Sequence, residues 1–545
     1  MRMSCSSNQE RTQQASLTSS LLEQEAKFSL SENDAEIVSE QRTTIPLYRQ
    51  ILYASFRLLS VASSTQGYFL SFFLLEAANL NSYYVGTLIW VKQAFDAITD
   101  PIVGELSDST RSPWGRRKPW IWLSVVPYVC IWILTWLIVP ALSSSQLNMF
   151  IYYLLLHLVF SFLSTCIMVP LLSLTPDMAS TYQSQSRIAL LQGIFSTIGA
   201  VASNFLVAQL IVIFPDSSSE VGDPNYQKGF LLAAGCLAPI LFAPLISVHA
   251  AIERPSPPPT EEDIENDRLW AMGCLGKLKC LFRFFATFAS AMRNALSFRP
   301  FLLFCLITTC SQIPITCFVA NFVLFSKYTL QTESLTKYEL LTLQMTFFSS
   351  APVWSIAIKF IGKKSCFYVG AVGWVGSEVA LFFLDAPVNI GLLFFVLICR
   401  GIFASVAQLV PMAILPDVCG QYERATTRRS EGLFFSIDLL TSKFAQAIVS
   451  GLSLYIIGAV GYQNPIAQTD EQREENYQPP SVVLTLRILV CILPIPFILI
   501  TIIFMYYIPE TAPVFVLQGR CRPFMPWLRR LFTSRFRSNR YETID

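Results

Sequence analysis

The sequence has few charged residues and almost no histidine, and these shortages exclude several classes of protein. Charged residues make up 14% of the 545 residues and hydrophobic residues 53%, which is too apolar for an ordinary soluble protein. With two histidines, and 14 cysteines that show no CxxC spacing, we predict neither a histidine metal site nor a disulfide framework. A formal net charge of +2 gives no reason to expect a nucleic-acid partner. No nucleophile–base pair or phosphate-binding loop is visible, so we expect no enzyme and no cofactor.

Long apolar runs dominate what is present. About 20 apolar residues suffice for a helix to cross a bilayer, and twelve segments reach that length in two sets of six. The first set is 51–75, 83–106, 119–141, 149–174, 188–214 and 229–248, and the second is 301–325, 340–361, 366–384, 390–415, 433–457 and 482–508. The sequence therefore predicts an all-α membrane protein with twelve transmembrane helices in two six-helix halves.

Polar segments separate and flank the two halves. Residues 1–46 are rich in Ser, Gln and Glu and lack an apolar run, which predicts a disordered cytoplasmic tail and not a signal peptide. The halves then cover 47–250 and 300–510, with a cytoplasmic linker at 251–299 and a basic cytoplasmic tail at 511–545. Linker and tail both mix Lys and Arg with Trp, Leu and Phe, a pattern typical of interfacial helices on anionic lipid. The alternative is that these cations only anchor the topology.

Basic residues in the short loops indicate the orientation. They follow the second, fourth, eighth and tenth expected spans, whereas the opposite loops are poor in Lys and Arg. The positive-inside rule places such loops in the cytoplasm, and the even number of spans then places both termini there. We expect a plasma-membrane protein in preference to one of an internal membrane.

Three charged residues share one face of the second span. Lys92, Asp96 and Asp100 are spaced i, i+4, i+8, so a helix aligns them. A carboxylate in hydrocarbon costs several kcal/mol unless it is paired, hydrated or bound to a cation. The pattern therefore predicts a Na⁺ or proton site on the wall of a cavity. The alternative is that both acids lie at the wet end of the helix and cap a loop.

Lys443 lies about ten residues into the eleventh span, too deep to reach the interface by snorkelling. We expect it to face the central cavity and to pair with an acid or a substrate anion, or else with purely structural carboxylates. Asp438 is five residues earlier, ~140° around the helix, and is not expected to be its partner. Two other intramembrane charges, Glu378 and Arg400, fit a structural ion pair or a functional role equally well. Arg57, near the cytoplasmic end of the first span, is expected to snorkel.

The linker between the second and third spans combines turn formers with cations. Arg116 and Arg117 are expected to bond helix C-terminal carbonyls or the acids of neighbouring loops, with Asp177 and Asp417 as natural partners. Such contacts would lock the cytoplasmic gate of a carrier, and the alternative is a topology signal alone. The two acids also end related stretches, 169–177 and 410–417, which indicates parallel six-span repeats with substrate bound between them.

Two motifs carry a resemblance to a known family. Asp96-Ala-Ile-Thr-Asp-Pro101, followed by Thr110-Arg-Ser-Pro-Trp-Gly-Arg-Arg-Lys-Pro-Trp120, resembles the glycoside–pentoside–hexuronide:cation symporters, the melibiose-permease branch of the major facilitators. Within that branch, Glu431-Gly-Leu-Phe-Phe-Ser436, Ser442-Lys-Phe-Ala445 and Gly461-Tyr-Gln463 look most like the sodium-dependent lysophosphatidylcholine symporters of animals. The resemblance covers residues 50 to 510.

The resemblance implies roles for single residues. Asp96 and Asp100 match the family's Na⁺-site aspartates, and Lys443 matches the lysine that serves cation coupling and, in the lysolipid carriers, the phosphate headgroup. One departure is Gln93, where the family usually has an arginine, with Lys92 beside it. The acids that sugar-transporting members use in spans one and four are also absent.

These observations together predict a cation-coupled secondary transporter that works by alternating access. Na⁺ or H⁺ is expected at Asp96 and Asp100, with Lys443 and Lys92 for coupling or for a substrate anion. A large apolar cavity lined by Phe and Leu would hold a lysophospholipid, and a sugar-like solute is the alternative substrate. A transport-dead scaffold or receptor is the rival class. We expect a monomer surrounded by membrane lipids.

Overall fold

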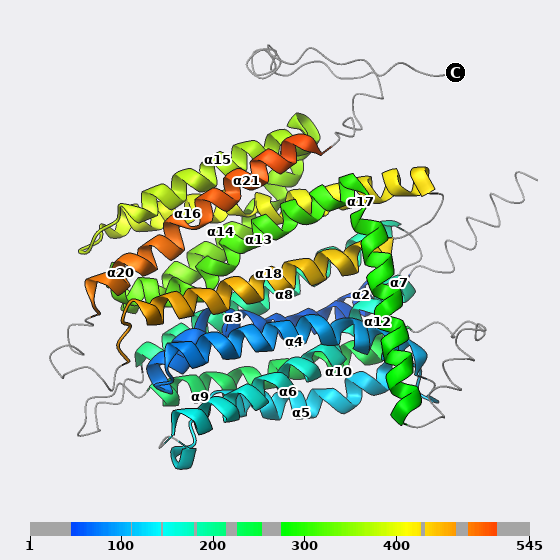
Figure 1. Cartoon of the computed structure of the whole chain (residues 1–545), viewed down its shortest axis with the longest axis horizontal. Helices are drawn as coiled ribbons and strands as arrows, with labels where there is room; N and C mark the ends of the chain where they lie inside the picture. Colours follow the sequence, from blue (N-terminus) through cyan, green and yellow to red (C-terminus); the bar gives the residue numbers. More distant parts are fainter. Residues whose placement is uncertain are drawn as a thin grey trace, which may run out of the picture.

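The computed structural model describes residues 45–110, 112–142, 145–178, 182–213, 226–252, 274–426, 431–464 and 478–508, and every regular element within them is helical. The expected tails lie outside the described residues, apart from 45–46. So does the first part of the linker, 253–273, whereas its second part forms α12 (Cys274–Leu296). Figure 1 shows α12 running across the ends of the other helices.

The first half contains six helical crossings. The first consists of α2 (Leu47–Ala54), η1 (Ser55–Leu59), α3 (Ser60–Phe72) and the π-helical turn η2 (Phe73–Ala77). The others are α4 (Ser82–Ser109), α5 (Lys118–Thr135), α6 (Gln146–Ser173), α8 (Tyr182–Ile213), and α9 (Tyr226–Leu237) with η4 (Ala238–Phe242) and α10 (Ala243–Ala250). Two short turns, η3 (Pro140–Leu142) and α7 (Thr175–Met178), lie between them.

The second half repeats this plan. Its first crossing is α13 (Arg299–Phe325), which ends in the π-helical turn η5 (Ser326–Leu330). The others are η6 (Glu333–Leu335) with α14 (Thr336–Ile361), α15 (Lys363–Phe382), α16 (Ile390–Ala404) with α17 (Val406–Thr426), α18 (Glu431–Ala459), and α20 (Pro480–Arg487) with η8 (Ile488–Ile492) and α21 (Pro494–Tyr507).

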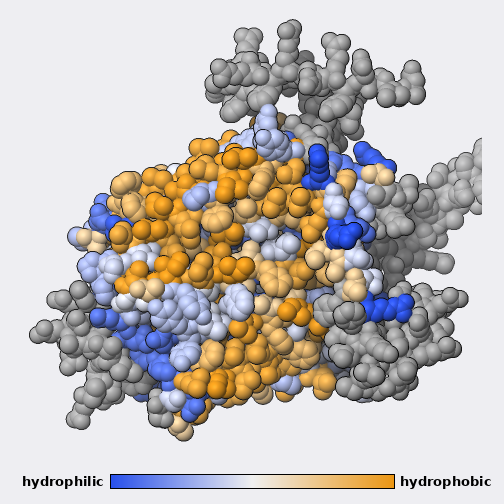
Figure 2. Space-filling model, in the orientation of Figure 1, coloured by the Kyte–Doolittle hydropathy of each residue, from blue (hydrophilic) through white to orange (hydrophobic). Residues whose placement is uncertain are grey.

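Eleven of the described crossings are long and apolar enough to span a membrane. The remaining one, α4, is not among them because its charged residues lower its hydropathy. Its 28 residues extend ~42 Å, more than the ~30 Å of the hydrocarbon core. The twelve expected spans correspond to these eleven segments and α4. Figure 2 shows an apolar band between hydrophilic ends, as a bilayer requires.

Local signals in the sequence fix several helix ends. Asn81, Ser145 and Asn389 cap α4, α6 and α16 by accepting a hydrogen bond from a backbone N–H of the first turn, which satisfies a donor that the helix leaves unpaired. Gly362 separates α14 from α15 with φ of +86°, a conformation that glycine adopts without the steric cost of a Cβ.

The two halves form two layers that meet along α4 and α18, which lie side by side (Figure 1). Glycines permit this close approach: a Cβ on Gly86 would lie 2.9 Å from the carbonyl oxygen of Gly451, and one on Gly451 would lie 2.9 Å from the Cβ of Trp90. Small residues of this kind are typical of tightly packed membrane helices. The interface therefore positions the charged face of α4 directly against α18.

Candidate functional site

Asp96 and Asp100 of α4 both bind the side chain of Lys443 from α18. The Nζ atom of Lys443 donates to Oδ2 of Asp96 over 2.6 Å and also to Oδ2 of Asp100. Ser161 of α6 donates to Oδ1 of Asp96 over 2.8 Å, and Thr165 donates to Oδ1 of Asp100 over 3.0 Å. The two acids are therefore neither lipid-facing nor loop caps: they link the two halves midway along α4.

The oxygens gathered here suit a hard cation. Two carboxylates and two hydroxyls form a ligand set that Na⁺ and other oxygen-seeking cations prefer. The ammonium of Lys443 bonds the same carboxylates, so a cation or proton that binds there competes with it. The side chains of Lys443, Asp96 and Asp100 are 24%, 28% and 17% exposed, which leaves the group accessible from the neighbouring cavity.

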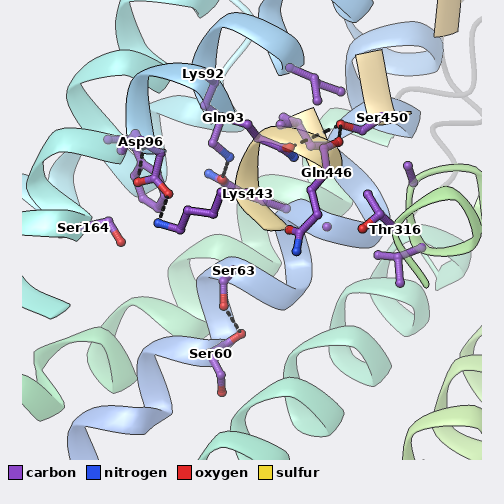
Figure 3. Close-up of a pocket in the computed structure, with 18 of the residues that line it drawn as sticks. Ser60, Ser63, Lys92, Gln93, Asp96, Ser164, Thr316, Lys443, Gln446 and Ser450 are labelled. Carbon is purple, nitrogen blue, oxygen red and sulfur yellow. Dashed lines mark hydrogen bonds and ion pairs between the residues drawn. The ribbon is translucent and has the colours of Figure 1, made fainter. Parts of the chain in front are cut away.

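A cavity of about 560 Å³ lies beside this cluster, between the halves. Figure 3 shows Lys92 and Gln93 of α4, Ser60 and Ser63 of α3 and the long side chains of α18 around it. The expected lining of Phe and Leu is wrong, because Phe160, Leu59 and Leu70 are the only such residues among the described lining. Serine, glutamine and charged residues make up more than half of the described lining by number, although apolar atoms contribute the larger share of its surface. Hydropathy along the sequence averages the lipid-facing and the cavity-facing side chains of each helix. It could therefore not predict which residues line the cavity.

Lys92 points into this cavity and does not join the aspartate cluster. Its Nζ atom donates to Oε1 of Gln66 on α3. Its neighbour Gln93, which replaces the family arginine, accepts a hydrogen bond of 3.4 Å from Ser450 of α18. Arg57 also lines the cavity, and its Nε atom has no hydrogen-bond partner among the described residues.

The expected gate residues lie at the end of the bundle that carries the basic loops, hereafter the basic end. Arg117 donates to Asp108 over 2.8 Å and to the carbonyl oxygen of Ser173, at the end of α6, also over 2.8 Å, and Arg116 precedes it in the same turn. Asp417 of α17 pairs with Lys363 over 2.5 Å. These contacts join neighbouring helices of the same half. The side chain of Asp177 lies outside the described residues.

The other intramembrane charges have separate partners. Arg400 pairs with Glu378 over 3.0 Å, and Trp374 donates to the same carboxylate over 2.7 Å. The Arg400 guanidinium also lies 3.3 Å from the ring centre of Phe318, a cation–π contact. These partners all belong to the second half, which favours the structural ion pair. Asp438 accepts from Thr308 and, as expected, does not contact Lys443.

A family model described as MFS/sugar transport protein matches residues 58–511. The chain belongs to this major facilitator family. This confirms the resemblance, the all-α fold and the assignment to transporters and not to enzymes.

Relatives of this transporter include the sodium-dependent lysophosphatidylcholine symporter 1-A of Danio rerio, 26% identical over 510 residues that cover 88% of this chain and 90% of that protein. The human symporter 1 is 25% identical, with 83% of each chain covered. The glucuronide carrier protein homolog of Escherichia coli K12 is 24% identical, with 82% and 89% covered. A solved POT family transporter has the same fold, with a TM-score of 0.58, 12% identity and 85% of this chain and 97% of that chain covered.

The transporter has a second charged cluster between its halves, which the sequence did not reveal. At the end opposite the basic loops, Oε2 of Glu76 lies 2.7 Å from Nζ of Lys327, and Oε1 accepts from Tyr328 over 2.6 Å and from Tyr462. Glu76 lies in η2, and Lys327 and Tyr328 lie in η5. Both turns begin at the ends of the expected spans 51–75 and 301–325. Charged residues are ordinary at such ends, so no sequence signal separates Glu76 from a loop residue.

Proposed function

We propose that this transporter is a cation-coupled symporter whose ion, Na⁺ or H⁺, binds at Asp96 and Asp100. The observation that carries the proposal is the bond of Lys443 to both aspartates across the two halves. An ion on the carboxylates weakens their attraction to Lys443 because it neutralises the same oxygens. Ion binding is thereby linked to the contact between α4 and α18, the helices that must move relative to each other during alternating access.

The described conformation supports the proposal that the transporter is closed at the end opposite the basic loops. Contacts between the halves there include the Glu76 cluster, a 2.7 Å bond from Ser71 to the carbonyl oxygen of Ala320, and a 3.2 Å bond from Asn464 to that of Asn79. The side chains of Glu76 and Lys327 are 0% and 5% exposed. Opening this end requires these bonds to break, so we propose that Glu76 and Lys327 act as the outer gate. Arg116, Arg117, Asp177 and Asp417 are proposed for the cytoplasmic gate.

A lysophospholipid is the first substrate we propose. The relatives named as lysophosphatidylcholine symporters support it, and so does the cavity, which joins cationic side chains to apolar ones such as Leu70, Phe160 and Val319. The polar lining favours a second candidate, an acidic sugar-like solute, and the glucuronide carrier homolog is a relative of that kind by name. In both cases the ion gradient drives uptake, and the attraction of Lys443 to the two aspartates weakens when the ion binds.

The membrane placement belongs to the same proposal. The transporter is a multi-pass membrane protein, and we infer that the basic end faces the cytoplasm, that the membrane is the plasma membrane and that the protein works as a monomer. α12 would then lie against the cytoplasmic lipid surface, as its basic and aromatic residues favour.

Ion-driven uptake into reconstituted vesicles tests the proposal. The full chain is incorporated into liposomes and given labelled lysophospholipids and labelled sugars, with and without an inward Na⁺ or proton gradient. Gradient-dependent uptake of at least one solute supports symport. Uptake of none of them, by protein that is folded and inserted, points to the transport-dead scaffold or receptor.

A further inference from the structure

Two cations line the cavity without a carboxylate partner. Arg57 of η1 and Lys92 of α4 both face it. Lys92 bonds the neutral side-chain oxygen of Gln66, and Nε of Arg57 is buried without a partner. No carboxylate of the described residues pairs with either cation. A cation in a membrane interior is expensive unless it is paired or hydrated.

The charges around the cavity do not cancel. Lys443 and one bound monovalent ion together balance Asp96 and Asp100. The charges of Arg57 and Lys92 then remain, because Asp96 is the only carboxylate among the described lining residues. While the cavity is open, water can solvate both cations. When the halves close over a substrate that water leaves, and an anionic group becomes the remaining source of compensation.

We propose that Lys92 and Arg57 form an anion subsite, and that the substrate carries a net negative charge, on a phosphate or a carboxylate. This inference rests on the proposed symport function and narrows its substrate class. Gln66, the partner of Lys92, lies nine residues after Arg57, which is ~14 Å along a helix. Lys92 is therefore the deep contact, and Arg57 is the contact nearer the basic end.

The same lining disfavours a zwitterion. A quaternary ammonium group is held by a cage of aromatic rings or by a carboxylate. The described lining offers Tyr128 and Phe160 as aromatic residues, and its one carboxylate, Asp96, already binds Lys443. The hydroxyl-bearing side chain of Thr316 also lines the cavity (Figure 3) and can donate to phosphate or carboxylate oxygens. We therefore expect an anion to be preferred over a neutral or zwitterionic relative of the same size.

Charge-matched pairs test this preference. The full-length protein in vesicles is given lysophosphatidic acid and lysophosphatidylcholine with one acyl chain, and glucuronate and glucose. The lipid pair and the sugar pair also separate the two possible sources of the anion. In at least one pair the anion is expected to have an apparent affinity at least about tenfold higher, since a charge-assisted bond contributes ~1.5–3 kcal/mol. Equal or better uptake of the uncharged or zwitterionic member in both pairs overturns the inference.

Variants of Lys92 and Arg57 test whether these two residues cause the preference for the anion. Lys92→Gln and Arg57→Gln are each expected to raise the apparent KM for the anion about tenfold, whereas Lys92→Arg and Arg57→Lys recover most of the affinity. An unchanged KM in both glutamine variants contradicts the assignment.

A binding measurement separates failure of this inference from failure of symport. If no gradient drives uptake of any compound, the symport proposal fails, and the thermal stabilisation of the purified protein by the same pairs decides the inference alone. The inference holds if the anionic member of a pair stabilises the wild-type protein and this stabilisation is lost in Lys92→Gln. Equal stabilisation by both members contradicts it.

Discussion

Lys327 and Glu76, 251 positions apart in the chain, meet at 2.7 Å with both side chains almost fully shielded from solvent. They come from the equivalent first crossings of the two halves, each of which ends in a π-helical turn. Such turns often occur at functional positions in helices. The pair therefore joins repeat-related helix ends by opposite charges.

Glu76→Gln is expected to favour opening of this end. Removing one member of a buried ion pair costs ~3–5 kcal/mol, and the cost falls on the closed conformation. A cysteine introduced at Ser82, which is buried where α4 meets α18, should then react at least about tenfold faster with a membrane-impermeant maleimide. Arg487→Gln is the control, because its partner Asp385 is 75% exposed and the pair is worth little. Equal labelling of both variants argues against a gate.

The hydroxyls around the aspartates are expected to set the apparent cation affinity. Ser161→Ala and Thr165→Val each remove a bond to Asp96 or Asp100, so the concentration of cation that gives half-maximal uptake should rise about three- to tenfold, since such bonds contribute ~1 kcal/mol or more. Ser164→Ala provides the matched control, because Ser164 lines the same cavity from the same helix. Identical cation-activation curves for all three variants would exclude these hydroxyls from the ion site.

Gly451→Val should impair transport by separating α4 from α18. Even its Cβ would lie 2.9 Å from the Cβ of Trp90, and overpacking of this kind costs ~1–3 kcal/mol. The maximal uptake rate should fall by about five- to a hundredfold at unchanged surface expression. Gly235→Val on α9, where nothing lies within 4 Å of an added Cβ, should transport normally. A normal rate for Gly451→Val would show that close contact of the two helices is not required.

Glu378→Gln should lower stability without altering ion coupling. Its partner Arg400 is left unpaired in the interior of the second half, so the unfolding temperature of the purified protein should fall by several degrees. The cation-activation curve of the folded variant should match that of the wild type. A shifted curve would indicate that this ion pair belongs to the coupling mechanism.

Local periodicity in the sequence predicted the structural features that depend on a single helix. The apolar runs gave the crossings, and the i, i+4, i+8 spacing placed Asp96 and Asp100 on one face of α4. Lys443 was recognised because a lysine so deep in a helix must have a partner. The identity of that partner depends on tertiary packing, since 347 positions separate Lys443 from Asp96.

Tertiary packing decided the remaining features. The direction of Lys92, toward Gln66 and the cavity and away from the aspartates, depends on where α3 lies relative to α4. The Glu76 cluster forms only because both π-helical turns and Tyr462 converge. The cavity lining likewise combines polar residues from both halves, and the average hydropathy of a helix does not show them.

Cation-dependent uptake by Asp96→Asn and Asp100→Asn is the decisive measurement of whether this pair of aspartates binds the coupling ion. In vesicles that accumulate substrate under an ion gradient, each variant should lose at least about tenfold of the gradient-driven uptake, because the neutral amide no longer attracts the coupling ion. Residual uptake should no longer respond to Na⁺ or pH. Gradient-driven uptake equal to that of the wild type in both variants would contradict coupling through this pair of aspartates.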